Sequence, residues 1–509
     1  MKSSSIKIWI IMVFAFLGQD FCAAQSIHTD IVRELNISKS LLGSSDSIAP
    51  ITSTIVKGKN WSLGVLPIAI DQLYNSELPI GYNLGSAIAA KGYQVLISAG
   101  IEASIGKHIT IKLNPEYVSA QNLDFEQFEQ AQGDRIWSSY YQFLNTIDLP
   151  NKMGDGPYKK FFAGQSNIKY QFKDFEAGIS TENIWWGPGW KNALIMSYNA
   201  PGFLHATINT KKPIKTKIGQ FSGQLIAGKL EESGILPPRI YSIYNGVFQY
   251  QPKFTGKRLM TGINFSWQPK WTPNLTIGYS AVAYFYATDF KSPLDVLPFD
   301  FNGKKGALGA MFIQYKLPAD KAEIYLEYGA KSPSFRRAYV AGFRKLFPIK
   351  NDAYIQFAAE LTQMQAQNID LIRDPNSWYT DKYVRQGYTN NGKTIGAGIG
   401  PGSNSENFEI AWVKGSKKIG LQFERLRHNS DYYYYAYEFI GDFRRHWIDL
   451  STTANVSLDF KHFLVAANLK ITRSYNYQWL VIQTDPLNYF QPGNEYLNIG
   501  GGLSLMFRL

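Results

Sequence analysis

The chain has 509 residues, a mean hydropathy of -0.21 and a formal net charge of +12. This mean hydropathy excludes a bundle of membrane-spanning helices, and the length exceeds the roughly 100–200 residues of one ordinary soluble domain. A large β-barrel fits both values, because alternate residues of each strand face a polar interior. No block of like charge stands out, so no nucleic-acid-binding arm and no nucleic-acid partner are expected.

Residues 1–24 have the three parts of a secretory signal peptide. A charged end with two lysines is followed by a short apolar run and by the small-residue cleavage site Cys-Ala-Ala, which ends at Ala24. The apolar run is too short to cross a bilayer, which takes about 20 helical residues. Cys22 is the only cysteine, so the mature chain is expected to have neither disulfides nor cysteine-bound metal.

Residues 25–60 are mixed and polar, and we expect a periplasmic segment with one short helix near residues 31–42. From residue 61 onward apolar side chains recur with a period of two, as in residues 93–105, 275–285 and 448–458. This alternation predicts half-polar strands, so residues 61–509 are expected to form one barrel. Aromatic residues at the predicted strand ends, 284–286 and 432–435, are typical of the interfacial girdles of an outer-membrane barrel.

Long polar and aromatic stretches separate the predicted strands, at residues 123–165, 287–306, 366–408, 428–446 and 474–496. Barrels of the outer membrane place their long loops outside the cell and their short turns in the periplasm. At roughly 25–30 residues for each strand and its loop, the mature chain has room for about 16–18 antiparallel strands.

Residues 180–205 combine three tryptophans, turn-forming residues and several amides. Trp185 and Trp186 cannot share one face of a strand, and the Gly-Pro-Gly at 187–189 breaks any ladder of hydrogen bonds. Indole faces stack on the C–H faces of sugars while Asn and Glu bond hydroxyls, which suggests a bend that contacts glycan. The alternative is an aromatic corner that only packs a turn, because Trp is mostly a large apolar filler.

Residues 182–189 (Glu-Asn-Ile-Trp-Trp-Gly-Pro-Gly), 192–197 and 200–203 resemble the signature of the Wzi family of outer-membrane capsule-assembly proteins, in its Bacteroidetes form. Further motifs follow the expected order, at 89–94, 113–116, 120–122, 164–166 and 386–392. The resemblance implies an outer-membrane barrel of 18 strands that acts as a surface lectin and holds capsular polysaccharide on the cell. Tyr198 departs from the pattern, because relatives tend to have Asn there. The N-terminal segment also looks too short for the periplasmic helical bundle of enterobacterial relatives.

Residues 387–394 match the phosphate-loop pattern, but their flanks exclude it. That loop needs a buried strand before it and a helix after it, whereas residues 396–402 contain four glycines and one proline. The Asn390-Asn391-Gly392 tip predicts a turn instead. The functional alternative is a loop that contacts glycan or folds into the lumen.

Catalytic and metal motifs are weak throughout the sequence. The six histidines show no metal-ligand spacing, and there is no nucleophile elbow. Glu323 and Glu327 share one strand face about 13 Å apart, which is too far for glycoside hydrolysis. We therefore expect neither an enzyme nor a cofactor.

The last predicted strand alternates Leu503, Leu505, Phe507 and Leu509 with more polar residues up to the end of the chain. Such an ending resembles the terminal signal that the outer-membrane insertion machinery reads, although its usual last residue is Phe. The three glycines just before this run predict a kink or a tight closure.

The first functional hypothesis is an outer-membrane lectin that binds and organises capsular polysaccharide or exopolysaccharide. The alternatives are a channel or exporter for saccharides and, third, an outer-membrane hydrolase or lipid A modifier. The expected partners are the polysaccharide, outer-membrane lipid and lipopolysaccharide, the insertion machinery and polysaccharide export proteins. The expected glycan-binding residues are Glu182, Asn183, Trp185, Trp186, Trp190, Asn192, Arg385, Tyr388 and Lys393.

Overall fold

The computed structural model describes residues 33–34, 36–37, 40–41, 52–128, 132–300, 303–332, 336–366, 377–437, 446–479 and 495–508. The predicted signal peptide, residues 1–24, lies outside this range, as does most of the segment 25–60. No helix in the described part of the chain is long and apolar enough to cross a membrane.

One antiparallel sheet of 24 strands dominates the molecule. Its first half consists of β1 (Ser53–Lys57), β2 (Trp61–Val65), β3 (Ile68–Asn75), β4 (Gly92–Ser98), β5 (Ile101–Ile105), β6 (Ile109–Leu113), β7 (Glu116–Ala120), β8 (Tyr158–Phe162), β9 (Asn167–Phe172), β10 (Phe175–Ser180), β11 (His205–Thr210), β12 (Ile214–Thr216) and β13 (Gly219–Leu230). Its second half consists of β16 (Arg258–Pro269), β17 (Leu275–Tyr286), β18 (Gly306–Leu317), β19 (Ala322–Ser332), β20 (Arg336–Pro348), β21 (Tyr354–Gln363), β24 (Asn404–Lys414), β25 (Lys417–Arg427), β26 (Ile448–Asp459), β27 (Phe463–Tyr475) and β28 (Glu495–Phe507).

Several of these strands are two halves of one longer strand. The halves β2/β3, β4/β5, β6/β7, β8/β9 and β11/β12 follow each other directly and pair with the same neighbours or with halves of one neighbour. Counting each such pair once, and leaving the short β1 aside, reduces the 24 strands of the described sheet to 18. The predicted range of 16–18 strands, with 18 favoured by the resemblance, is confirmed.

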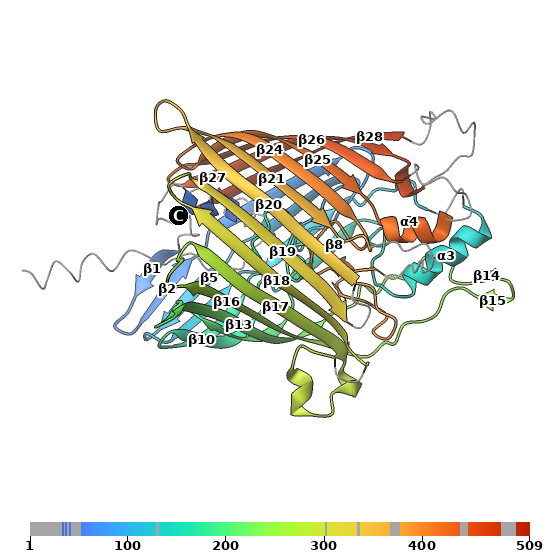
Figure 1. The fold of residues 1–509 in the computed structure, drawn as a ribbon, viewed down its shortest axis with the longest axis horizontal. Helices are drawn as coiled ribbons and strands as arrows, with labels where there is room; N and C mark the ends of the chain where they lie inside the picture. Colours follow the sequence, from blue (N-terminus) through green and yellow to red (C-terminus); the bar gives the residue numbers. More distant parts are fainter. Residues whose placement is uncertain are drawn as a thin grey trace, which may run out of the picture.

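The C-terminal strand closes the sheet into a barrel. β28 pairs with β27 along one edge, and its residues 500–507 pair with β3 along the other. Leu503, Leu505 and Phe507 are exposed on the outer face, as their alternation predicted. Figure 1 shows the resulting cylinder of tilted strands.

The two faces of the wall have opposite character. On β19 the outward Ile324, Leu326 and Tyr328 are exposed, whereas the inward Glu323, Tyr325 and Glu327 are buried. An outer face of large apolar residues suits hydrocarbon, and a polar inner face suits a hydrated or plugged lumen. The period of two in the sequence therefore reports the two faces correctly.

The two ends of the barrel also differ. At the turn end, short connections join the strands, for example residues 106–108, 318–321 and 415–416. At the loop end, the connections are long and carry α3 (Asp134–Leu144), α4 (Ser430–Tyr437) and the hairpin of β14 (Ile243–Tyr244) and β15 (Val247–Phe248). Figure 1 places the helices and this hairpin together, opposite the C-terminus.

The predicted aromatic girdles at residues 284–286 and 432–435 are wrong. Tyr284 and Tyr286 face the lumen, where their hydroxyls contact Asp381 and Gln386. Tyr432 and Tyr433 belong to α4, which packs against α3. The pattern misled because girdle residues at strand ends and buried residues of short loop helices are of the same aromatic types.

The N-terminal segment reaches into the turn end of the barrel. Its described residues at 33–34, 36–37 and 40–41 have helical backbone, in agreement with the helix expected near 31–42. Leu41 packs against Leu346 and Val413, which face inward near that end. These described helical residues therefore lie against the lumen, whereas residues 53–57 of the same segment form β1 in the sheet.

Candidate functional site

The tryptophan-rich residues 181–204 fold into the lumen. They leave the wall at the end of β10 and return at β11, and these two strands pair from Phe175 to Ser180. Their middle part reaches strands on the far side of the ring, where Leu194 N–H donates to Glu327 Oε1 at 3.1 Å. Gly187, with φ of 114°, makes a bend that other residues rarely adopt. The segment therefore crosses the interior and blocks it.

One carboxylate of the wall holds this crossing segment. The backbone N–H groups of Trp190, Lys191 and Asn192 all donate to Glu360 of β21, at 3.1 Å for Lys191 and 2.9 Å for Asn192. The Tyr325 hydroxyl donates to the same carboxylate at 2.8 Å. Successive N–H groups that point at one anion form a nest, so the Trp-Lys-Asn turn is shaped around Glu360.

The three tryptophans of this segment differ in how far they are buried and in their contacts. Trp186 is 1% exposed and donates from Nε1 to Gln224 at 2.9 Å. Trp190 is also 1% exposed and donates to Glu34 of the N-terminal segment at 3.0 Å. Trp185 is partly exposed, with the guanidinium of Arg33 at 3.9 Å from its ring. The indole faces of Trp186 and Trp190 are thus covered by protein.

The predicted polar residues of this segment are buried with partners. The Glu182 carboxylate lies 3.2 Å from Lys112 Nζ and 3.0 Å from Lys169 Nζ. Burial alone raises its pKa, but the two ammonium groups more than offset this, so the pKa of Glu182 is lowered. Asn183 donates to the Ala200 carbonyl, and Asn192 donates to Thr362.

A second segment, residues 377–403, fills the lumen beside the first. It contains the hairpin of β22 (Thr389–Asn390) and β23 (Lys393–Thr394), whose tip has positive φ at Asn391 and Gly392, so the predicted turn is confirmed. Tyr388 is fully buried and donates to the Ile195 carbonyl at 2.9 Å, which joins the two segments. We call residues 181–204 and 377–403 together the lumen plug.

The two predicted basic residues of this segment lie apart. Arg385 donates from Nε to the Asn145 carbonyl, and from its two terminal nitrogens to the carbonyls of residues 251–252, at the loop end. Lys393 Nζ donates to the Gly85 and Ala87 carbonyls at 2.9 and 2.8 Å. Burial lowers the pKa of the Lys393 ammonium to about 7.

A cavity of about 250 Å³ lies between the lumen plug and the inner faces of β25, β26 and β27. Residues 78–82 and 149–151, from two long loops, line it from the loop end, together with Tyr477 and Gln478. Lys393 is the only one of the nine predicted glycan-binding residues that lines it. We call this cavity the wall pocket.

The wall pocket has an aromatic and ionic lining. The rings of His428 and Trp447 are stacked, with centroids 3.8 Å apart and an interplanar angle of 17°. Asp449 accepts from Trp447 Nε1 at 3.1 Å and lies 2.8 Å from His428 Nε2. These contacts hold the Trp447 indole beside the Asp449 carboxylate and the His428 imidazole. Hydroxyl-bearing side chains, among them Ser451 and Tyr477, line the same cavity.

Glu424 and Lys470 form a second polar group on the same lining, with 2.9 Å between Oε2 and Nζ. The Tyr82 hydroxyl donates to the other oxygen of Glu424. Burial, and then the adjacent carboxylate, raise the pKa of Tyr82 well above its ordinary value, so this phenol stays a hydrogen-bond donor. In the described residues no group of three or more His, Cys, Asp or Glu side chains could hold a metal ion.

The sequence did not point to the wall pocket, because its lining comes from many separate segments. Trp447 and His428 flank residues 429–446, and each alone resembles an ordinary loop residue. One pattern in the sequence could have indicated part of the lining. Asp449, Ser451 and Lys470 occupy the alternate positions of β26 and β27 that face the lumen, so their polar side chains are expected there.

The comparisons with known proteins give one family model and a set of similar solved structures. The model of the capsule assembly protein Wzi family matches residues 88–479. Among solved structures, Escherichia coli Wzi is described as an outer membrane protein involved in group 1 capsule assembly and a carbohydrate-binding β-barrel. It aligns with a TM-score of 0.60 at 11% identity, over 96% of this chain and 95% of its own.

Acinetobacter baumannii OccAB2 aligns with a TM-score of 0.42 at 11% identity, over 89% of this chain and 99% of its own. OccAB1 of the same organism aligns with a TM-score of 0.42 at 8% identity, over 91% of this chain and 100% of its own. No curated protein sequence matches the chain significantly. Because the family model matches well over half of its residues, the chain belongs to the capsule assembly protein Wzi family.

Proposed function

We propose that this protein is an outer-membrane lectin that binds capsular polysaccharide or exopolysaccharide in the wall pocket, with the loop end outside the cell. The observation that carries the proposal is the pocket itself, which combines a stacked indole with carboxylate, ammonium, phenol and amide groups. Sugars present C–H faces and hydroxyls, and such a lining complements both. Long loops of outer-membrane barrels lie outside the cell, which sets the direction.

Membership of the capsule-assembly family supports this assignment, as does the description of Escherichia coli Wzi as carbohydrate-binding. The residues expected from the sequence keep a supporting role in the proposal. Lys393 lines the wall pocket, and Tyr388 joins the two segments of the lumen plug behind it. In this proposal Trp185, Trp186 and Trp190 stabilise the lumen plug, and the plug forms the inner side of the wall pocket.

The lumen plug argues against the alternative of an open saccharide channel. A continuous cluster of buried apolar residues, among them Trp186, Leu194 and Tyr379, runs through the described interior. A diffusing saccharide needs a continuous wet path, and close-packed side chains do not provide one. The proposal includes no catalytic step.

Binding of purified protein to an array of bacterial surface oligosaccharides tests the proposal. We expect Trp447→Ala to weaken the strongest interaction at least tenfold, because truncating a central aromatic contact typically costs more than about 1.4 kcal/mol. Trp271→Ala is the matched control, since Trp271 is 67% exposed in a turn at the opposite end. Heat-modifiable migration on gels verifies that each variant is folded.

Two results would contradict the proposal. One is a folded wild-type protein that binds no oligosaccharide on the array or in capsule extracts of its own host. The other is a folded Trp447→Ala protein with wild-type affinity. Loss of binding in Trp271→Ala would instead place the glycan at the turn end.

A further inference from the structure

A patch of the outer face of the barrel, centred on Phe285, is buried. Phe285 of β17 lies between Tyr284 and Tyr286, which both point into the lumen, so its own side chain points outward. Phe285 is nevertheless only 1% exposed, whereas Met311 on the neighbouring β18 is 60% exposed. Ala283 and Ala307, a cross-strand pair on the same face, are buried as well. Another part of the chain must therefore cover the outer wall here.

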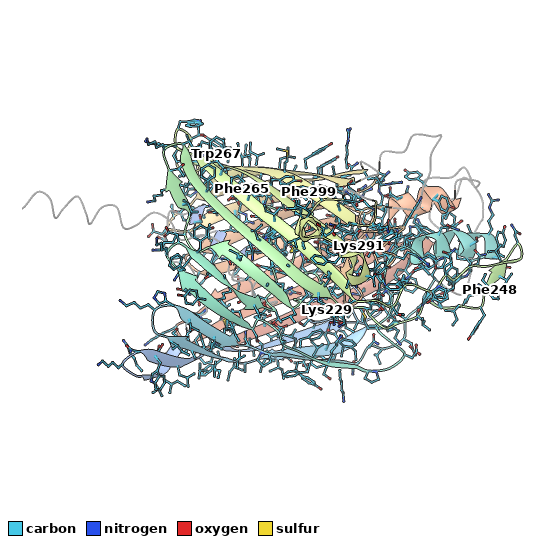
Figure 2. All side chains as sticks on the ribbon, turned by 90° about the horizontal axis from the view of Figure 1, so that it is seen from below. Lys229, Phe248, Phe265, Trp267, Lys291 and Phe299 are labelled. Carbon is cyan, nitrogen blue, oxygen red and sulfur yellow. The ribbon has the colours of Figure 1, made fainter. Side chains whose placement is uncertain are left out.

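The covering part is the connection between β17 and β18. The Phe290 ring stacks on Phe285 with centroids 6.4 Å apart, and Lys305 Nζ lies 5.0 Å from the Phe285 ring. Figure 1 shows this connection hanging beside the barrel, and Figure 2, seen from below, shows Phe299 and Lys291 in front of the wall. We call residues 287–300 the wall flap.

The wall flap has secondary structure of its own and an ion pair to the wall. It contains the short 3-10 helices η1 (Ala287–Asp289) and η2 (Pro293–Val296), and a capping box between Ser292 and Asp295 starts the second. Lys305 lies beneath it, with Nζ 3.3 Å from Asp295 Oδ1, and its side chain is 2% exposed. The flap is thus fixed to the wall from its inner side.

The flap also carries several exposed apolar side chains. Five large apolar side chains are exposed there by 41–68%, namely Phe290, Leu294, Val296, Leu297 and Phe299. Five such residues within ten positions are unfavourable in water, because exposed apolar surface of this kind is normally buried. Lys257, at the base of the flap, and Lys291 are exposed beside them.

We infer that the wall flap lies in the outer leaflet of the membrane, with its five apolar side chains among lipid acyl chains. The flap continues the apolar outer face of β17 and β18, and it lies at the loop end of those strands. Exposed apolar residues with lysines beside them are typical of segments that lie at a membrane interface, where the ammonium groups reach the headgroups. Two of the three aspartates of the flap bind protein groups, Asp295 at Lys305 and Asp289 at the Tyr383 hydroxyl. The flap is therefore a lateral lipid contact rather than a cover over the mouth of the barrel. The assignment to the outer leaflet rests on the proposed function, in which the loop end lies outside the cell.

Site-specific fluorescence in vesicles tests the inference. A Cys22→Ser background removes the only cysteine of the sequence, and Leu294→Cys then carries a single fluorophore on the flap. Met311→Cys, on the outer wall, is the lipid reference, and Tyr241→Cys, 83% exposed at the loop end, is the water reference. Each protein is reconstituted in phosphatidylethanolamine–phosphatidylglycerol vesicles with nitroxide-labelled acyl chains, or with iodide in the buffer.

The expected result is that nitroxide lipid quenches the Leu294 probe within twofold of the Met311 probe, and that iodide quenches it several-fold less than the Tyr241 probe. A Leu294 probe that behaves like Tyr241, while Met311 is in lipid, overturns the inference and leaves the membrane barrel intact. A Met311 probe in water overturns the membrane location itself. If the Leu294 probe is shielded from both quenchers until tenfold more lipid is added, a second copy covers the flap and the lipid assignment is wrong.

Discussion

The contact between Glu360 and the lumen plug gives the sharpest test of how the interior is held. In Glu360→Ala, the N–H groups of residues 190–192 and the Tyr325 hydroxyl lose their shared acceptor. Each buried donor left unpaired costs about 1–3 kcal/mol, which gives about 4–12 kcal/mol for four donors. Removing a buried carboxylate returns several kcal/mol of desolvation, so we expect a net local loss of about 2–5 kcal/mol.

This loss should appear in the plug and not in the wall, because the strand ladder of β21 is made by backbone groups that the substitution leaves in place. Hydrogen exchange at residues 190–194 should accelerate by about 30-fold to several thousand-fold, at about 1.4 kcal/mol per factor of ten. Migration of the heat-modifiable barrel should stay unchanged.

Gln356→Ala is the matched control for this experiment. Gln356 is fully buried on the same strand and face, and its amide donates to Glu409 of β24 at 2.8 Å. Exchange at residues 190–194 that differs less than threefold between Glu360→Ala and Gln356→Ala would refute the reasoning that these amides depend on Glu360.

Three further predictions concern the closing strand β28, Trp186 and Lys393. Deleting residues 503–509 should abolish the heat-modifiable barrel, because β3 loses most of its closing partner and each unpaired backbone group in lipid costs several kcal/mol by order of magnitude; protease-resistant material in the membrane fraction would contradict this. Trp186→Ala should destabilise the plug by about 3–5 kcal/mol, measured by exchange, since it empties a fully buried site. An acidic oligosaccharide should bind more weakly at pH 8.5 than at pH 6, because burial lowers the pKa of Lys393 to about 7 and the ammonium loses its charge as the pH rises. Lys393→Met should flatten that profile in affinity titrations, whereas a folded Lys393→Met protein with the wild-type pH profile would contradict this prediction.

The barrel was readable from the sequence because its signal is local. A period of two needs only neighbouring residues, and one polar and one apolar face follow from it directly, as on β19 and β28. The helices α3 and α4 were not expected, because they are short and lie in aromatic stretches that resemble strand ends. The wall flap lies within the predicted long loop at 287–306. Its packing against the outer wall could not be predicted, because no local sequence pattern indicates it.

The candidate site was less readable, because its residue types fit two environments equally well. Trp186 and Trp190 suit a sugar-stacking surface and a buried core alike, and only the path of residues 181–204 through the lumen decides where their rings lie. The partners that decide it, Gln224, Glu34 and Glu360, are far away in sequence. The role of the nine predicted residues in glycan binding stays a prediction.

The pairing of β25, β26 and β27 has a mechanical consequence for a protein that retains a polymer. The wall pocket opens on the inner faces of these strands, and each pair is held by a continuous register of ten or more residues, from Lys418↔Ser457 to Arg427↔Ile448 in the first. A pull along the barrel axis has a large component along the tilted strands, and this component strains the whole row of hydrogen bonds together instead of opening them one at a time. A bound chain dragged by fluid flow would therefore detach from the pocket before the wall yields.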